Sequence, residues 1–130
     1  MKPKQLAGCV IYNAERELLL LHRKTRELSQ WELPGGKFEG ADDTLQDTAE
    51  RELFEELGVR AERIVKQGSV HFFQATVEFA FEWFEVEIEG KPYIRERHLF
   101  DALRFWDVQV LAERTDISPN VRNLLQQLGV

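Results

Sequence analysis

The chain has 130 residues, of which 43% are hydrophobic and 31% are charged, and its net charge is −6. This size and composition fit a single globular domain over residues 1–130, with no apolar run near the roughly 18 residues of a membrane span and no signal-peptide pattern. The acidic balance argues against binding of extended nucleic acid, and no membrane partner is expected. A small anionic substrate stays open if metal ions bridge its charge.

The N-terminal segment reads as two strands joined by a turn. Residues 5–12 and 17–22 are largely apolar and residues 13–16 between them form a turn signal, so we expect a β-hairpin. The one cysteine, Cys9, lies in the first strand and cannot form an internal disulfide, which favours a packed thiol and a reducing, cytoplasmic location. His22 lies at the end of the second strand, where a lone histidine is more often structural or exposed, so we assign it no role.

The stretch 34–59 predicts a flexible segment followed by a long helix. Trp31 precedes it and suits either the core or a pocket wall, and the glycines at 35–36 let the backbone approach a ligand or metal. Oxygen-bearing side chains at 42–44 can cap the first turn of a helix of about fifteen residues, and Gly58 can end it. An apolar stripe recurs every four residues along this helix: Leu45, Ala49, Leu53 and Leu57.

Three carboxylates share one flank of this predicted helix. Glu52 and Glu56 are one turn apart and Glu55 lies between them in sequence, so their like charges repel one another. Arg51 can offset part of this repulsion as the i,i+4 partner of Glu55. Hard oxygen ligands on a rigid element suit Mg²⁺ or Mn²⁺. A solvated acidic helix face is the alternative for this cluster taken by itself.

The second half of the chain predicts more strands and two further helices. Residues 61–74 and 75–89 read as long strands, and the apolar alternation of the second strand slips after Trp83, which suggests a bulge. Most of the aromatic side chains here are expected in the core, with one or two able to line a pocket. The remaining elements are a strand at 103–106, a short helix to Ala112 capped by Asp107, and a final helix opened by Ser118 and Pro119.

The stretch 34–59 resembles the signature box of the Nudix (MutT-type) hydrolases. That pattern runs Gly, five residues, Glu, seven residues, Arg-Glu-aliphatic, one residue, Glu-Glu, one residue, Gly-aliphatic. Its second half matches at every position: Arg51, Glu52, Leu53, Glu55, Glu56, Gly58 and Val59. The first half departs from it, because counting back from Arg51 gives Asp43 whereas counting forward from Gly36 gives Asp42. The loop is therefore one residue longer, and neither aspartate is assigned a role.

The resemblance implies a metal site and a catalytic group. Mg²⁺, with Mn²⁺ as a substitute, would be held by Glu52, Glu55, Glu56 and the carbonyl of Gly35. Arg51 would orient the glutamates. Glu55 is also one of two candidates for the general base that takes a proton from the attacking water.

Residues outside the box also receive roles through the resemblance. Glu96 best fits a loop glutamate that serves as metal ligand or general base, and Asp101 is the next candidate; an exposed loop carboxylate is the alternative. Arg23 and Lys37 would contact substrate phosphate, and Asn120 would contact a purine edge.

The element order and the resemblance together predict an α+β Nudix fold, with a mixed β-sheet between α-helices. The expected activity is Mg²⁺-dependent hydrolysis of a nucleoside diphosphate-X bond, with a (deoxy)nucleoside triphosphate giving the monophosphate and pyrophosphate. The expected partner is a small nucleotide, and the chain is expected as a monomer or homodimer. Alternatives are an ADP-ribose, nucleotide sugar, dinucleoside polyphosphate or capped RNA hydrolase, and a non-catalytic nucleotide sensor.

Overall fold

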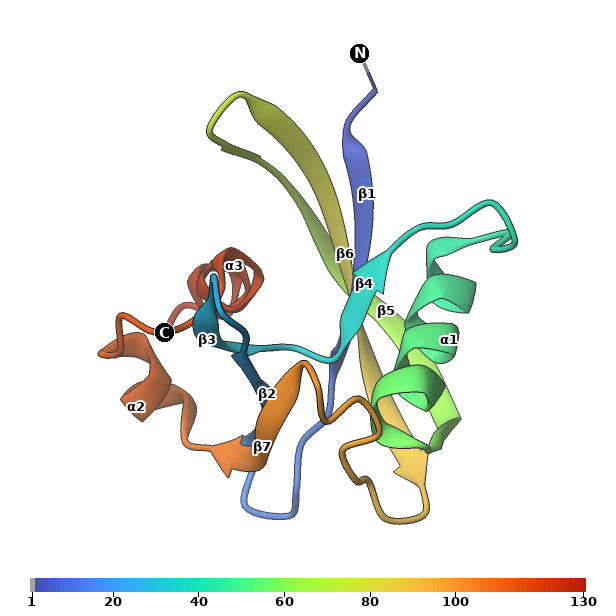
Figure 1. Ribbon diagram of the computed structural model, residues 1–130, viewed down its shortest axis with the longest axis vertical. Helices are drawn as coiled ribbons and strands as arrows, with labels where there is room; N and C mark the ends of the chain where they lie inside the picture. The colour runs from blue at the N-terminus through green and yellow to red at the C-terminus, as the bar shows by residue number, and fades with distance from the viewer. Residues whose placement is uncertain (1) are drawn as a thin grey trace.

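The computed structural model describes residues 2–130 and contains two β-sheets and three helices (Figure 1). Its helices are α1 (Leu45–Leu57), α2 (Val108–Ala112) and α3 (Pro119–Gln127). Its strands are β1 (Lys4–Val10), β2 (Leu18–Lys24), β3 (Ser29–Glu32), β4 (Gly35–Lys37), β5 (Arg60–Gln74), β6 (Val77–Glu89) and β7 (Phe100–Trp106).

One sheet is mixed and the other is antiparallel. The strand order is β4-β1-β6-β5 in the first sheet, where β1 runs parallel to β6, and β3-β2-β7 in the second. Helix α1 lies on one side of the first sheet and α3 on the other (Figure 1). The predicted α+β fold with a mixed sheet between helices is therefore confirmed. Within residues 2–130, no helix is long and apolar enough to cross a membrane.

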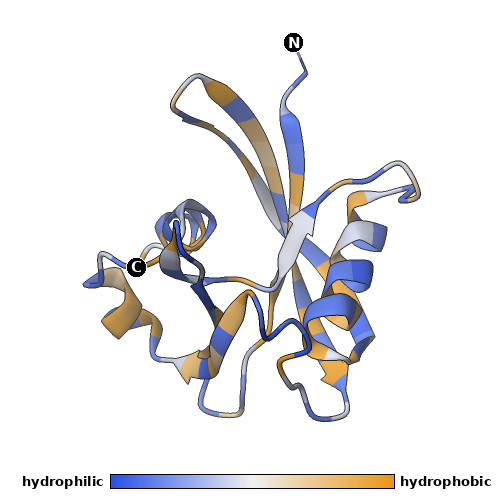
Figure 2. Ribbon diagram, viewed as in Figure 1, coloured by the Kyte–Doolittle hydropathy of each residue, from blue (hydrophilic) through white to orange (hydrophobic). Residues whose placement is uncertain are grey.

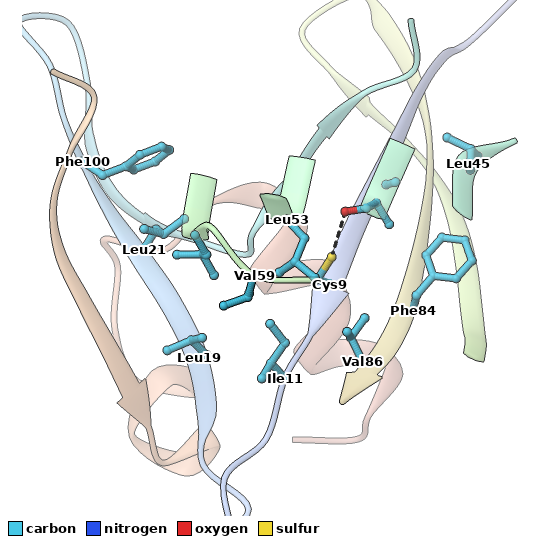
Figure 3. Close-up of a cluster of buried hydrophobic side chains, with 13 residues drawn as sticks. Cys9, Ile11, Leu19, Leu21, Leu45, Leu53, Val59, Phe84, Val86 and Phe100 are labelled. Atoms are coloured by element: carbon cyan, nitrogen blue, oxygen red, sulfur yellow. Dashed lines mark hydrogen bonds between the residues drawn. The ribbon is translucent and has the colours of Figure 1, made fainter. Parts of the chain in front are cut away.

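Two hydrophobic cores fill the space on either side of the first sheet. The core beneath α1 contains Cys9, whose fully buried thiol donates to the carbonyl of Ala49 at 3.5 Å (Figure 3). Burial raises the pKa of this thiol, in agreement with the predicted packed cysteine. The core beneath α3 contains Trp31, Trp106 and the apolar side chains of α3 itself: Val121, Leu124 and Leu125.

The predicted bulge is present, but in the neighbouring strand. Phe81 and Trp83 face the α3 core whereas Phe84 and Val86 face the α1 core, so β6 keeps a regular alternation and is simply buried on both faces. The β5–β6 pairing has two register shifts, and the one between Lys66 and Gly68 of β5 lies opposite that point. Figure 2 shows apolar and polar bands along the β5–β6 ribbon.

The predicted N-terminal hairpin is wrong. Strands β1 and β2 belong to different sheets, and contact between the two segments is confined to the turn, where Tyr12 bridges Leu18 and backbone hydrogen bonds run from Leu19 to Ile11 and from Asn13 to Glu17. The physical reason is that both strands are apolar on both faces: Leu18 to Leu21 are all fully buried. Each strand therefore takes an inner position with two other neighbours.

The box helix forms as predicted. Thr44 is its N-cap and shares a capping box with Asp47, while Gly58 ends it with φ 66° in the left-handed region. The ring of Tyr93 lies against Gly58, so any side chain there would both strain the backbone and collide with this ring. The loop between β6 and β7 is thereby packed onto the end of α1.

Candidate functional site

Two glycines bring a short strand between β1 and α1. Strand β4 pairs with β1 through Gly35 opposite Gly8 and Gly36 opposite Ala7. A Cβ on Gly35 would collide with the carbonyl oxygen of Ala7, and a Cβ on Gly36 would lie 2.6 Å from the carboxyl carbon of Glu52. Gly35 thus excludes a side chain, whereas at Gly36 a side chain would displace the carboxylate of Glu52, against which the backbone lies directly.

Glu56 is held at the end of this glycine strand. Only 5% of it is exposed, and its Oε1 accepts a hydrogen bond from the backbone N–H of Gly35 at 2.8 Å. Burial raises the pKa of Glu56 well above its ordinary value, and the charges of Glu52, Glu96 and Glu32 raise it further, against the opposing effect of the Gly35 bond. The ionised form of Glu56 is therefore strongly disfavoured at this position unless a positive charge lies beside it.

Glu52 experiences the same environment to a lesser degree. Burial raises its pKa, the hydrogen bond and charge of Arg51 oppose that shift, and Glu55 and Glu96 reinforce it. Glu55 itself is about half exposed, with 48% of its side chain accessible. The helix thus presents two enclosed carboxylates and one solvated carboxylate on the same flank.

The loop after β6 places Glu96 beside these carboxylates. The N–H of Arg95 donates to the carbonyl of Glu56 at 3.0 Å, and Glu96 receives hydrogen bonds at its own carbonyl from Leu99 and Phe100. The Glu96 charge acts on Glu52 and Glu56, as their raised pKa values reflect. Asp101, the other candidate, instead contacts His22 Nδ1 at 2.6 Å.

Arg51 ties the glutamates to the loop. It donates to both oxygens of Asp42 at 3.0 and 2.9 Å, to Glu52 at 2.8 Å and to the carbonyl of Lys37 at 3.0 Å, and it reaches Glu55 at 3.3 Å. This guanidinium therefore fixes the directions of two glutamates and the start of the loop.

Asp42, and not Asp43, is the partner of Arg51. Asp42 is 7% exposed and also accepts from the hydroxyl of Thr48 at 2.9 Å, and the Arg51 hydrogen bonds hold the pKa of Asp42 well below its usual range. Asp43 is exposed, and its N–H donates to Asp47. The extra residue of the loop therefore lies after Asp42, between this aspartate and the helix.

The carboxylates fit a hard divalent cation by their chemistry. Within residues 2–130, no three Asp, Glu, His or Cys side chains are already gathered at ligand distances. Among the described residues, however, protein hydrogen bonds to Glu52 and Glu56 reach only their Oε1 atoms, which leaves Oε2 of each available. Their raised pKa values indicate that a cation would stabilise the ionised pair.

The three predicted substrate-contacting residues line one pocket. Arg23 from β2, Lys37 from β4 and Asn120 from the first turn of α3 surround a cavity of about 290 Å³, which also reaches Gly35 and Gly36. The fold thus gathers residues from three distant segments beside the glycine strand.

Arg23 is not a free cation in this pocket. Its Nε donates to Glu32 Oε2 at 2.7 Å and its Nη2 to Glu32 Oε1 at 3.1 Å, and Gln30 donates to the same carboxylate at 2.7 Å. The guanidinium also lies 4.8 Å from the Phe100 ring centre. A phosphate would therefore have to compete with Glu32 for Arg23, whereas the side chain of Lys37 has no ion-pair partner among the described residues.

The family of this chain follows from comparison with known proteins. A family model described as the NUDIX domain matches residues 2–128. The chain belongs to the NUDIX domain family. Its fold is similar to that of the MutT NUDIX hydrolase of Burkholderia pseudomallei. The TM-score is 0.83, the sequence identity is 24%, and 98% of each chain is covered.

Two curated relatives are similar to part of this Nudix domain. It is 29% identical to RNA pyrophosphohydrolase of Bartonella henselae over 76 residues, which are 53% of this chain and 43% of that protein. It is 37% identical to human nucleoside diphosphate-linked moiety X motif 6 over 57 residues, which are 44% of this chain and 18% of that protein. The matches span less than half of either relative.

Several pocket residues of this Nudix domain were not predicted. Glu32 and Gln30 lie shortly before the glycines, but nothing local signals that Glu32 pairs with Arg23 or that Gln30 donates to Glu32. Phe72 and Phe79 form a cross-strand pair with ring centres 5.3 Å apart and planes inclined by 18°, and both line the pocket. Phe72 and Phe79 lie equally far from the chain reversal at 75–76, and this symmetric spacing was the signal that could have identified them as a cross-strand pair.

The sequence left Trp31 in either the core or a pocket wall, and its packing decides between them. Trp31 is a core residue, because it packs edge-on against Trp106 at 4.9 Å and is only 9% exposed.

A larger cavity, of about 430 Å³, lies near the other end of α3 between Tyr12, Trp83 and Leu124, and contains none of the predicted site residues. The smaller cavity is therefore the better candidate, since Gly35 and Gly36 line it and contact the carboxylates of α1.

Proposed function

We propose that this Nudix domain is a metal-dependent pyrophosphohydrolase that converts a nucleoside triphosphate to its monophosphate and pyrophosphate. The observation that carries this proposal is the position of the buried Glu56 carboxylate on the N–H of Gly35, where β4 adjoins the pocket containing Lys37 and Asn120. An acidic centre next to a polar pocket suits a substrate whose phosphates arrive with bridging metal ions.

Mg²⁺, with Mn²⁺ as a substitute, would be held by Glu52, Glu55, Glu56 and the carbonyl of Gly35. When bound, the metal supplies charge neutralisation at the phosphate oxygens and makes a water molecule more acidic. The available Oε2 atoms of Glu52 and Glu56 support this assignment. Arg51 would keep Glu52 and Glu55 in place while the metal binds.

The chain's own side chains would perform the proton transfer and position the substrate. Glu96 or Glu55 would accept the proton of the attacking water, the water oxygen would bond to phosphorus, and the anhydride bond would break to release pyrophosphate. Lys37 would stabilise charge on the phosphates. Arg23 could join it once its bond to Glu32 is exchanged for a phosphate contact.

The pocket supports a single nucleoside as the bound group. Its volume of about 290 Å³ lies near the lower end of the range for small-ligand pockets. The stacked pair of Phe72 and Phe79 offers an aromatic wall for a base, and Asn120 would contact a purine edge.

A second substrate class is favoured by one comparison. The similarity to an RNA pyrophosphohydrolase makes a phosphorylated or capped RNA end the principal alternative, in which only the terminal nucleotide would enter the pocket. ADP-ribose, nucleotide sugars and dinucleoside polyphosphates are further alternatives, as is a non-catalytic sensor. We also propose a cytoplasmic protein, monomeric or homodimeric; the buried free thiol of Cys9 suits a reducing compartment.

The proposal is tested by release of pyrophosphate and phosphate from a substrate panel, with and without Mg²⁺. The panel contains nucleoside triphosphates, oxidised nucleotides, ADP-ribose, dinucleoside polyphosphates and a 5′-triphosphorylated oligonucleotide. Mg²⁺-dependent turnover of one triphosphate, lost in Glu56→Gln, is the expected result. Preference for the oligonucleotide would move the assignment to RNA ends, and nucleotide binding without turnover would support the sensor.

A further inference from the structure

A hydrogen-bonded chain of serine, histidine and aspartate lies outside the carboxylate site. His22 Nδ1 lies 2.6 Å from Asp101 Oδ1, and His22 Nε2 lies 3.3 Å from the hydroxyl oxygen of Ser29. Because a carboxylate only accepts, Asp101 keeps the proton on Nδ1 and leaves Nε2 to accept from the serine hydroxyl. This is the order of atoms by which a histidine acts as general base toward a serine nucleophile.

The backbone fixes each member of this chain. The three residues come from adjacent strands of the β3-β2-β7 sheet, and Asp101 is the extra residue at the register shift where His22 pairs with Ala102 and Arg23 with Phe100. A bulge of this kind re-aims a side chain. Ser29 opens β3 after a turn closed by the hydrogen bond from Thr25 to Leu28 at 2.9 Å.

Packing restricts the orientation of the His22 imidazole. The His22 ring lies 4.9 Å from the Trp31 ring centre, and 16% of the side chain is exposed, so its orientation is restricted. Asp116 also lies within electrostatic reach, since the charge of His22 contributes to the lowered pKa of that carboxyl, after the dominant effect of Arg114. The contact with Asp101 and the packing against Trp31 therefore fix the ring with Nε2 toward Ser29.

We propose that Ser29 is an activated nucleophile that accepts acyl groups from small activated esters. The Ser29 oxygen bonds to the ester carbonyl carbon, His22 Nε2 takes the hydroxyl proton, and the leaving alcohol departs with that proton. Water then attacks the acyl-serine with the same base, which releases the acid and restores Ser29. Ser29 is exposed, so small donors reach it directly, and Asp101 is half exposed, so the activation is smaller than in an enclosed triad.

The experiment measures acetylation by p-nitrophenyl acetate, with peptide mass mapping at Ser29 and p-nitrophenol release as readouts. Ser69, an exposed serine of β5, is the internal control. We expect Ser29 to react at least about tenfold faster than Ser69, below the 10²–10⁴-fold typical of positioned bases. If acetyl-Ser29 is hydrolysed too quickly for mass mapping, continuous p-nitrophenol release that is lost in Ser29→Ala supports the proposal equally.

Two variants distinguish activation of Ser29 by His22 and Asp101 from reactivity that arises only because Ser29 is exposed. His22→Gln should lower Ser29 reactivity to that of Ser69, and Asp101→Asn should lower it partly. Asp101→Asn changes a half-exposed side chain, so it keeps the test decisive if His22→Gln fails to fold. Equal rates at Ser29 and Ser69, or reactivity unaffected by either variant, would overturn the assignment. Metal-dependent hydrolysis should persist in all three variants, because none of these residues belongs to the carboxylate site.

Discussion

Arg51 donates hydrogen bonds to both oxygens of Asp42, at 3.0 and 2.9 Å, and through the same guanidinium to Glu52. This pairing connects the loop after the glycines to the acidic flank of α1. Asp42 is 7% exposed and sits nine positions before Arg51, so the contact depends on the path of the loop. The lengthened loop thus supplies a carboxylate that pairs with Arg51.

Asp42→Asn should lower the rate of hydrolysis while leaving the glutamates of α1 in the chain. Without the second carboxylate oxygen Arg51 gains freedom, and a misplacement of Glu52 near 1 Å costs about a hundredfold in rate. Steady-state kinetics would measure the effect, with Asp43→Asn as the matched control because Asp43 is exposed and does not contact Arg51. Equal losses in the two variants would contradict the assignment of Asp42 as the partner.

The same pair predicts a loss of stability in acid. Arg51 holds the folded-state pKa of Asp42 below the roughly 3.9 of an unfolded aspartate, so the unfolded chain binds more protons as the pH falls. The stabilisation is present above the unfolded pKa and disappears as pH drops through the folded value. Thermal unfolding between about pH 6 and pH 3 should be less pH-dependent in Asp42→Asn than in wild type or Asp43→Asn. An unchanged dependence would place the acid sensitivity elsewhere.

Glu56→Gln should make the metal-free protein more stable and remove its activity. The pKa of Glu56 is raised in the folded state, so its ionised form opposes folding once the pH exceeds the unfolded value of about 4.3. The amide removes this cost and can still accept from the N–H of Gly35. Melting temperatures without metal should rise, whereas added Mg²⁺ should stabilise wild type more than the variant. A melting temperature lower than that of wild type in metal-free buffer would argue against charge burial.

Gly36→Ala should reduce activity more than stability. The new Cβ would lie 2.6 Å from the Glu52 carboxyl carbon, and the flexible end of that side chain can move away. Glu52 would then leave its bond to Arg51 and its place in the carboxylate group. Gly40→Ala is the control, since a Cβ at Gly40 meets nothing within 4 Å. Hydrolysis rates and melting temperatures of the two variants, compared in parallel, would separate the effects; similar rates would remove Glu52 from the site.

Sequence signals close to one another in the chain predicted the box helix. The features that the sequence analysis missed depend on pairing between residues that are far apart in the chain. Capping by Thr44 and termination by Gly58 depend on neighbouring residues, and they occur as expected. Strand partners do not follow from local pattern, so β1 and β2 entered different sheets. Asp42 could not be distinguished from Asp43 by counting, because only the loop path shows which one turns inward.

The pocket illustrates the same division. Lys37 and Asn120 were selected by resemblance, and their common pocket arises from contacts between segments far apart in the chain. The bond between Arg23 and Glu32 depends on the pairing of β2 with β3, a strand that was not predicted. His22 received no role from sequence because neither Ser29 nor Asp101 is its neighbour in the chain.

The most direct test of the proposed hydrolase is Mg²⁺-dependent pyrophosphate release from nucleoside triphosphates by wild type and Glu56→Gln, both verified as folded. Wild type should turn over one triphosphate only with metal, and Glu56→Gln should be slower by about 10²-fold or more, because the carboxylate nearest the glycine strand is neutralised. Equal rates in the two proteins, or a wild-type rate independent of Mg²⁺, would contradict catalysis by the carboxylates of α1.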